Sequence, residues 1–398
     1  MKKIIASAVG LALVGGVAVT TASAVESQFG GYWRTRSFVQ SDFTGQDTPD
    51  YNRTDNRTRL YYTAKFNDDF KFVNKFEFNS NWGDTNGGDI GADGDTFRVK
   101  NSYADFTLGM VRSTVGIQGA VIQRGFVFDD DFSGFVVRAD FGGWTLPVLY
   151  TTAVDDDVNV AADGDVHLAS IMPKFTLGDF TLTPSLTYMN ATSGLDASMA
   201  WVGLDVDAKF DTVSAWGSFI YSTGDEYDAT FTGTGNDQDG YLVAAGASAG
   251  IFHGQAFYAS GEDNPGAGDS DAFASAPGQS YYWSEIMGLG IFDNQASAGA
   301  PGGQITNVMA LNAGVTLKPA DKLKLDFDVW YAALAEDNAN GDDALGVEFD
   351  AKLTYALMDN LNAEFVLAYL MADDATTNNA ESNDKDPIEA GVRLSLKF

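Results

Sequence analysis

Basic residues recur two positions apart in several stretches of the chain, a spacing that puts their side chains on one face of an extended strand. Arg34 and Arg36 are the first such pair, and Arg57 and Arg59 are the second. A row of guanidinium and ammonium groups on one strand face could attract anions and orient dipolar solutes. The basic residues that share a face by this alternation are Arg34, Arg36, Arg57, Arg59, Lys71, Lys75, Arg98, Lys100, Arg112 and Arg138.

Acidic residues take a similar position in the later part of the chain. They are Asp205, Asp207, Asp326, Asp328, Glu348, Asp350 and Glu364. If the strands that carry both sets enclose one space, a basic wall faces an acidic wall, and dipolar solutes between them experience a transverse field. The alternative interpretation is that the two sets only neutralise each other.

The sequence offers little for catalysis or for a bound cofactor. His167 and His253 are its only histidines, and neither has a serine or acidic partner at a recognisable catalytic spacing. The lack of cysteine excludes disulfides, zinc knuckles, iron–sulfur clusters and covalently attached haem. We therefore predict no enzymatic activity, no cofactor and no metal centre. The formal net charge of −31 argues against nucleic acid as a partner.

The stretches that carry these charges are predicted to be strands. Phe70 and Phe72 alternate with Lys71 and Val73, and each stretch is long enough for a tilted strand that crosses a membrane. We predict eighteen strands, with sixteen as the alternative because the connections at 192–196 and 251–252 are the weakest assignments. The predicted strands are residues 28–40, 54–66, 69–82, 95–108, 111–120, 133–142, 144–154, 165–178, 180–191, 197–210, 212–224, 238–250, 253–261, 304–318, 321–335, 344–358, 361–372 and 386–398.

Short and long connections alternate between these strands. Short turns such as Asn67-Asp68 and Gly142-Gly143 are built from turn-forming residues. The long connections are residues 41–53, 83–94, 121–132, 155–164, 225–237, 262–303, 336–343 and 373–385. A membrane barrel with short periplasmic turns and long extracellular loops has this pattern.

The charged strand faces must then point into the barrel. A charge that faces lipid at the bilayer midplane costs about 2–4 kcal/mol, so the apolar faces contact lipid and the charged faces enclose a polar, water-filled interior. The predicted fold class is all-β: a transmembrane antiparallel up-and-down β-barrel of about eighteen strands.

Both ends of the chain favour a membrane barrel. Lys2 and Lys3 precede an apolar run over residues 4–19 and an Ala-Ser-Ala sequence at 22–24, which is typical of a cleaved secretory signal. We expect removal of residues 1–24 and a barrel domain over residues 25–398. Residues 387–398 alternate between apolar and polar and end on Phe398. This stretch resembles the C-terminal signature of Gram-negative outer-membrane proteins, which the insertion machinery reads.

Over residues 25–398 the chain resembles the general porins of the bacterial outer membrane in architecture. Residues 56–68 are also similar to the second strand of alginate-export-type barrels, which have eighteen strands and an arginine-lined lumen. The resemblance implies an outer-membrane location, contact with lipid and lipopolysaccharide, and a homotrimer. Clustered acids in the long loops could bind divalent cations, but none has the spacing of a calcium loop, so a solvated surface is favoured.

Two long connections are candidates for narrowing the interior. In general porins the third external loop forms the constriction, and residues 121–132 take that place here, with Arg124, Asp129, Asp130 and Asp131. Residues 262–303 are the second candidate because a loop should not leave many apolar residues exposed. Those residues are Tyr281, Tyr282, Trp283, Ile286, Met287, Leu289, Ile291 and Phe292. They are expected to fold inward, cover the opening or contact a neighbouring subunit.

The sequence favours a porin that lets small hydrophilic solutes and ions diffuse through a water-filled channel. One alternative is a substrate-selective channel for anionic sugars or polyanions. The other is a barrel that sheathes a partner protein, such as a periplasmic electron carrier.

Overall fold

The computed structural model describes residues 25–43, 45, 47, 50–84, 89, 97–154, 165–192, 196–228, 233–263, 268–293, 303–377 and 385–398. The predicted signal segment, residues 1–24, lies outside the described residues. Parts of several predicted long loops, including residues 155–164, also lie outside them.

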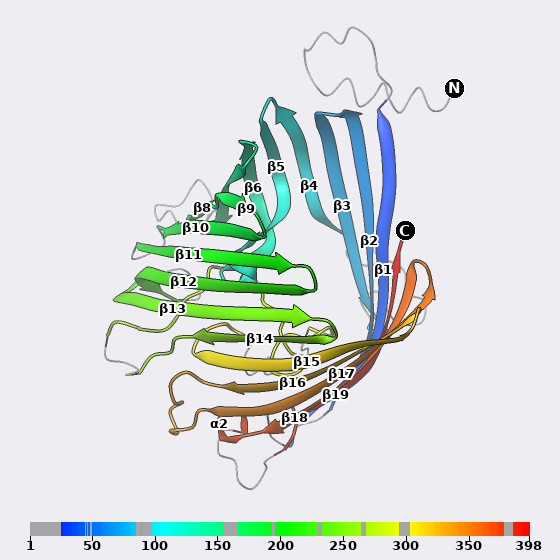
Figure 1. Ribbon diagram of the computed structural model, residues 1–398, viewed down its shortest axis with the longest axis vertical. Helices are drawn as coiled ribbons and strands as arrows, with labels where there is room; N and C mark the ends of the chain where they lie inside the picture. The colour runs from blue at the N-terminus through cyan, green and yellow to red at the C-terminus, as the bar shows by residue number, and fades with distance from the viewer. Residues whose placement is uncertain are drawn as a thin grey trace.

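Strands dominate the described part of the chain (Figure 1). Its elements are β1 (Glu26–Ser41), β2 (Tyr51–Asn67), β3 (Phe70–Asn81), β4 (Phe97–Leu108), β5 (Val111–Ile122), the short 3-10 helix η1 (Gln123–Gly125), β6 (Phe128–Asp140), β7 (Trp144–Val154), β8 (Val166–Ile171), β9 (Lys174–Leu177), β10 (Phe180–Ala191), β11 (Ala197–Phe210), β12 (Val213–Tyr227), β13 (Gly233–Ala249), β14 (Phe252–Ala259), β15 (Val308–Ala320), β16 (Leu323–Ala333), β17 (Ala344–Met358), β18 (Leu361–Ala372), α2 (Asp374–Thr377) and β19 (Ile388–Lys397).

The strands β8 and β9 occupy a single position in the sheet. Both pair with β7 on one side and with β10 on the other. Pro173 lies between them and has no N–H to donate to the ladder, so the strand is interrupted there. The nineteen described strands therefore fill eighteen positions, as the sequence predicted.

The sheet closes on itself. Each strand pairs antiparallel with the next, and β1 pairs with β19 from Tyr32 opposite Lys397 to Ser41 opposite Ile388. The Gly31 N–H donates to the Phe398 carbonyl at 2.7 Å. A Cβ at Gly31 would lie 2.4 Å from the Phe398 ring, so the terminal aromatic packs where only glycine leaves room. The predicted antiparallel, up-and-down barrel is confirmed.

The alternation of connections is also confirmed. Tight turns such as Gly109-Met110 and Gly178-Asp179 lie at one end, here called the short-turn end. Gly109, Gly142, Gly178 and Gly250 adopt positive φ angles of 61°, 83°, 63° and 61° in such turns. The long connections lie at the opposite, long-loop end.

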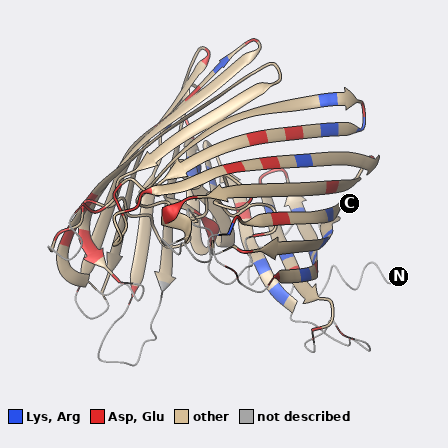
Figure 2. Ribbon diagram, turned by 90° about the horizontal axis from the view of Figure 1, so that it is seen from below, with Lys and Arg blue, Asp and Glu red and all other residues tan. Residues whose placement is uncertain are grey.

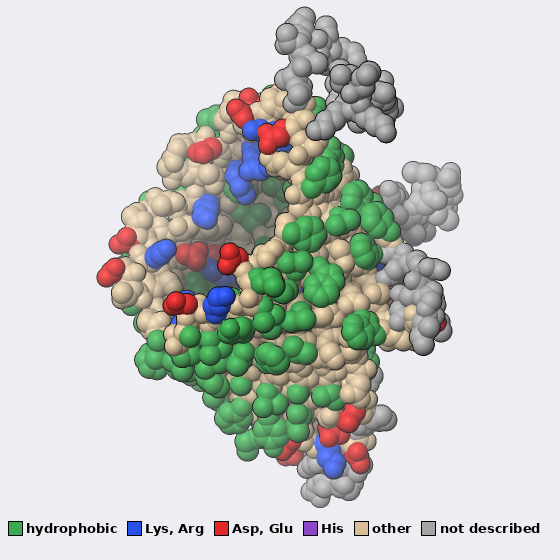
Figure 3. Space-filling model, turned by 90° about the vertical axis from the view of Figure 1, so that its right-hand side faces the viewer, with side chains coloured by type: hydrophobic (Ala, Val, Ile, Leu, Met, Phe, Trp, Pro, Cys, Tyr) green, Lys and Arg blue, Asp and Glu red, His purple; other side chains and the backbone are tan. Residues whose placement is uncertain are grey.

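The outer surface of the barrel is apolar. Leu204, Phe219, Val243, Leu311 and Phe365 are between 40% and 58% exposed. Figure 3 shows apolar side chains gathered over one outer face, beside a hollow that contains charged side chains. No helix in the described ranges is both long and apolar enough to cross a membrane. The apolar outer surface of the strands suits contact with lipid.

The interior is only partly polar, whereas strand alternation by itself predicted a polar, water-filled interior. Wall residues such as Leu149, Trp201 and Ile220 pack with inserted residues such as Phe126 and Met287 in one buried apolar cluster. The reason is that two connections fold inside and need apolar partners. Strand alternation predicts which side chains face inward but not what they meet there.

Candidate functional site

The end of the β5–β6 hairpin leaves the barrel wall and enters the lumen. β4 pairs with β5 only as far as Ile117, and β7 pairs with β6 only from Gly134. Beyond these points the hairpin strands pair only with each other, up to Ile122 opposite Phe128. We call residues 118–133 the hairpin end.

Two glycines mark the bend of this hairpin. Gly116 lies opposite Gly134 in the pairing. A Cβ would lie 2.2 Å from the Ser102 carbonyl oxygen at Gly116 and 2.1 Å from the Tyr150 carbonyl oxygen at Gly134. The close approach of the neighbouring strands therefore requires glycine at both positions.

The hairpin end differs from the predicted loop 121–132 in its structure. Only residues 123–127 connect the strands, and Asp129, Asp130 and Asp131 belong to β6, which begins five residues earlier than predicted. The acidic run gave this segment the composition of a loop. Strand pairing is retained because Phe128 and Phe132 pack in the apolar cluster while Asp131 accepts hydrogen bonds from Lys100 and Asn101 of β4.

Arg124 reaches from the tip of the hairpin end to the opposite wall. Gln123, Arg124 and Gly125 have φ angles of 49°, 59° and 91°, and left-handed non-glycine residues cost about 1–3 kcal/mol each. The Arg124 side chain donates to Asp207 at 2.8 Å and to Ser218 at 3.1 Å. Its guanidinium lies 4.8 Å from the Trp216 ring centroid, so the strained turn is held by polar and cation–π contacts on β11 and β12.

The long connection between β14 and β15 also folds inside, over its described residues 268–293. It follows the hairpin end closely: the Ala276 N–H donates to the Val127 carbonyl at 3.1 Å, and the Asp129 N–H donates to Gly278 at 3.0 Å. The rings of Phe126 and Tyr281 stack with centroids 4.0 Å apart. Burial raises the pKa of Tyr281 to about 12, so its hydroxyl stays neutral.

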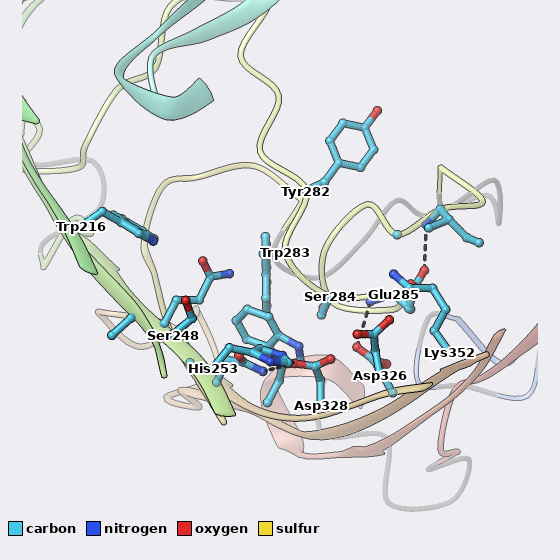
Figure 4. A pocket seen from close by; sticks show the side chains of 18 of the residues that line it. Trp216, Ser248, His253, Tyr282, Trp283, Ser284, Glu285, Asp326, Asp328 and Lys352 are labelled. Atoms are coloured by element: carbon cyan, nitrogen blue, oxygen red, sulfur yellow. Dashed lines mark hydrogen bonds and ion pairs between the residues drawn. The ribbon is translucent and has the colours of Figure 1, made fainter. Parts of the chain in front are cut away.

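Tyr282 is 55% exposed and borders open space in two parts of the lumen. It lines a cavity of about 700 Å³ toward the short-turn end and another of about 760 Å³ beside the hairpin end. Figure 4 shows Trp283 pointing toward the strands of the wall and Tyr282 pointing away from them. Burial, then the charge of Asp293, raises the pKa of Tyr282, which keeps a neutral hydroxyl at this position.

The first predicted basic pair holds the inserted segment. Arg36 donates to Asp293 at 2.8 Å and to the Ile291 carbonyl at 2.9 Å, and it forms two hydrogen bonds with Asp55 at 3.0 and 2.6 Å. Arg34 lies 3.5 Å from Asp293. Both arginines are buried, so they bind the protein's own loop.

Four of the other predicted basic residues have acidic neighbours that the sequence reasoning missed. Arg59 lies 2.6 Å and Arg57 3.6 Å from Glu77. Lys71 lies 3.2 Å and Arg112 2.6 Å from Asp105. Asp55 and Glu77 obey the same alternation as the basic residues, so counting acids on those strand faces could have found them. Asp105 is out of step with Arg98 and Lys100 on β4, and it reaches the same face only because of the bulge in the β3–β4 pairing.

The remaining four basic residues differ in their surroundings. Lys75 lies over the Tyr61 ring at 5.4 Å, and Arg138 lies opposite Arg112 in the strand pairing. Arg98 is exposed opposite Glu77, and a bulge next to Lys75 shifts the β3–β4 register. Because of this bulge, Lys100 and Asn101 can both reach Asp131 although they are adjacent in sequence.

The predicted acidic residues also have local partners. Asp326 contacts Thr316 at 2.7 Å and Lys324 at 2.9 Å, and Asp328 contacts His253 at 2.8 Å. Glu364 forms two hydrogen bonds with Arg393 at 2.6 and 2.8 Å, and Ser218 donates to Asp205 at 2.5 Å. Acidic and basic bands occur together on several strands in Figure 2.

Glu348 and Asp350 contact the inserted segment. Glu348 accepts hydrogen bonds from the N–H groups of Ile286 and Met287 at 2.7 and 2.8 Å. The Glu285 N–H lies 3.4 Å from an Asp350 oxygen. Thus the predicted set contains residues that face solvent and residues that hold a loop.

The two histidines lie in different parts of the barrel. His167 of β8 contacts Tyr150 at 3.1 Å on the barrel exterior. His253 belongs to β14 and faces the lumen. In the described ranges, no group of three or more histidines and acids is arranged to hold a metal ion.

Comparison with known proteins shows the fold. No family model matches the chain, and no curated protein matches it. The chain is similar to Pseudomonas aeruginosa OpdK, solved with vanillate, at a TM-score of 0.61 and 12% identity, covering 94% of this chain and 98% of that one. It is similar to Acinetobacter baumannii OccAB4 at a TM-score of 0.60 and 12% identity, again over 94% and 98%.

A further OpdK structure, described as an outer membrane protein of Pseudomonas aeruginosa, matches at a TM-score of 0.60 and 13% identity over 93% of this chain and 99% of that one. The architecture is therefore that of an outer-membrane β-barrel. At these identities the likeness extends to the fold alone.

Proposed function

We propose that the chain is a porin of the bacterial outer membrane that lets small hydrophilic solutes and ions diffuse through its lumen. The closed barrel, its apolar exterior and its fold similarity to outer-membrane proteins support this proposal. In this account residues 1–24 are the signal segment, Phe398 ends the strand that the insertion machinery reads, and the short turns face the periplasm. Lipid and lipopolysaccharide surround the barrel, and the homotrimer stays a prediction.

The observation that carries the proposal is the arrangement around Tyr282. Its side chain lines two cavities of several hundred cubic ångströms, and charged and polar groups line both cavities as well. One contains Lys100, Asp129 and Asp130, and the other contains Asp326 and Lys352. A hydrated solute could pass this position, whereas the neighbouring apolar cluster would exclude it.

The pathway in this proposal runs from the cavity beside the hairpin end, past Tyr282, to the cavity that residues of β12–β17 line. On the hairpin side, Arg57, Arg59, Lys75, Arg98 and Lys100 belong to β2–β4, and Asp129 and Asp130 lie on the hairpin end. In this proposal a basic wall still faces acidic groups. Near the constriction, the hairpin end provides those acidic groups. Glu77 pairs with Arg59 and Asp131 pairs with Lys100, which reduces the positive charge, so the proposed selectivity is weak.

A substrate-selective channel for small anions is the second candidate. The OpdK structure holds vanillate, and Arg57 and Arg98 could meet a carboxylate in the same half of the lumen. A barrel that sheathes a protein partner is less suitable, because the lumen contains the hairpin end and residues 268–293. We propose no catalytic residues and no enzymatic activity.

Single-channel recording in planar bilayers tests the proposal. Stepwise conductance with weak ion selectivity is the expected result. Strong anion selectivity with block by small carboxylates would favour the second candidate. A correctly folded, inserted barrel that shows no conductance would contradict both.

A further inference from the structure

The segment Ser284–Ile291 is wound around two carboxylates. The N–H groups of Ile286 and Met287 point at the two oxygens of Glu348, a fully buried residue of β17. The Ile291 N–H donates to the Glu285 carboxylate at 2.7 Å. Backbone N–H groups of this short segment thus donate to one carboxylate of the barrel wall and to one carboxylate of the segment itself.

Short internal hydrogen bonds give this segment a defined shape. The Gly288 N–H donates to the Ser284 hydroxyl at 2.7 Å, and the Gly290 N–H donates to the Ser284 carbonyl at 2.9 Å. Gly290 has a φ angle of 53°, and a Cβ there would lie 2.6 Å from the Glu285 carbonyl oxygen. Because these bonds fix the shape of the turn, a contact that holds one part of the segment also fixes where its two ends lie.

The opposite flank is held from β1. Arg36 binds the Ile291 carbonyl and the Asp293 carboxylate, and Asp55 orients Arg36 through two hydrogen bonds. Phe292 stacks on Phe38 with ring centroids 4.7 Å apart. The segment is consequently fixed at both ends to one part of the wall, between β17 and β1, which only β18 and β19 separate.

The anchor on β17 is electrostatically costly. Glu348 lies beside Glu285 and Asp350, and burying several acidic groups together is unfavourable unless hydrogen bonds compensate. Two charge-assisted bonds to backbone N–H groups provide such compensation and also fix where those N–H groups lie. Without Glu348 both donors would be buried without this acceptor.

We propose that Glu348 is a positioning residue for the constriction: it fixes Ser284–Ile291 and thereby holds Tyr282 between the two cavities. It acts through the backbone of the segment and does not contact the permeating solute. This inference rests on the proposed function, because it concerns the width of the same pathway.

A labelling experiment tests the clamp directly. The chain has no cysteine, so Leu289→Cys supplies a single thiol reporter inside the segment. Adding Glu348→Ala removes two charge-assisted hydrogen bonds, and we expect the thiol to react about tenfold faster or more. Glu348→Gln keeps the shape of the side chain and one acceptor oxygen. Its labelling rate should therefore lie between the rate of the Leu289→Cys reporter alone and the rate with Glu348→Ala. Asp359→Asn, an exposed acid in the β17–β18 turn, is the matched control and should leave the rate unchanged.

Permeation measurements then separate positioning from a merely structural role. In liposome swelling with neutral sugars of increasing size, Glu348→Ala should admit larger sugars than the parent or Asp359→Asn. Lower resistance of the barrel to heat, with an unchanged sugar cut-off, would overturn the proposal. So would faster labelling without a change in cut-off, or unchanged labelling.

The two proposals can fail separately. A parent protein that inserts but admits no sugar would contradict the proposed function. A parent that conducts normally, with Glu348→Ala indistinguishable from it, would contradict only the positioning role. Glu348→Gln serves as the deciding variant if Glu348→Ala does not insert.

Discussion

The hairpin end and the segment 284–293 both fill the lumen, but different forces hold them there. The hairpin end is an extension of two wall strands and buries Phe126 and Val127 completely. The segment 284–293 has no strand pairing; it also buries Ile286, Met287 and Phe292 completely, but it differs in being held by Glu348 and Arg36 through its backbone. An apolar anchor is insensitive to pH and salt, whereas a charged anchor responds to both. The comparison suggests a fixed wall on one side of Tyr282 and an adjustable one on the other.

Removing the Phe126 ring should have the largest effect. Phe126 is fully buried, and its ring stacks on Tyr281 at 4.0 Å. Phe126→Ala should destabilise the packed insert by about 3–5 kcal/mol through lost burial and a cavity. Hydrogen exchange of residues 118–133 measures the change. Phe126→Leu, which keeps most of the volume, should cost much less, and equal effects of both variants would contradict an apolar anchor.

Neutralising Asp293 should have a smaller effect, limited to the charged anchor. Asp293→Asn keeps the size of the side chain and suits the φ angle of 60° at this position. The lost charge-assisted contacts with Arg36 and Arg34 should weaken the segment by about 1–3 kcal/mol. Exchange should rise in residues 284–293 while the hairpin end stays protected. A rise in both regions would show that the two anchors form one unit.

The pH should affect the segment 284–293 through its buried Glu285. Burial, with the nearby charge of Glu348, raises the pKa of Glu285, against the opposing contributions of the Ile291 N–H, Lys352 and Arg393. The inserted segment therefore binds a proton more tightly than a released one would. Its extra stability is present below the ordinary glutamate pKa of about 4.3 and is lost as the pH rises through the raised value.

Exchange of residues 284–293, corrected for the intrinsic pH dependence of amide exchange, should thus show loosening as the pH rises. Glu285→Gln does not titrate at this position and should weaken that dependence. A segment that loosens instead as the pH falls would contradict the assigned sign.

Neutralising the basic wall should have the smallest effect. Arg57 and Arg59 are partly exposed and share Glu77. Such charges interact by less than about 1 kcal/mol, so replacing both with glutamine should lower the anion preference less than about fivefold. Reversal potentials in a salt gradient measure the change. Unchanged potentials would remove these arginines from the pathway.

Much of the barrel could be predicted from the sequence because its wall obeys a two-residue period. Strand alternation, turn residues and connection length located all eighteen positions, including β19 with its terminal Phe398. The start of β6 was missed because Asp129, Asp130 and Asp131 resemble a loop in composition. Paired with β5 inside the lumen, these acids are tolerated without facing lipid.

The candidate site was harder to predict for a physical reason. Alternation assigns a side chain to the lumen but does not show whether it meets water, a counter-ion or an inserted loop. Arg36 and Glu348 were assigned to the wall of the channel, and both bind residues 286–293 instead of open solvent. That pairing depends on how residues 262–303 fold, and this loop has no periodic pattern.

The most direct test of the account is covalent block at Tyr282. Tyr282→Cys places the single cysteine of the chain between the two cavities. A bulky hydrophilic thiol reagent should then reduce the single-channel current in discrete steps, whereas the cysteine-free parent should be unaffected. Complete modification of Cys at this position, verified by mass spectrometry, with an unchanged current would contradict a solute pathway past Tyr282.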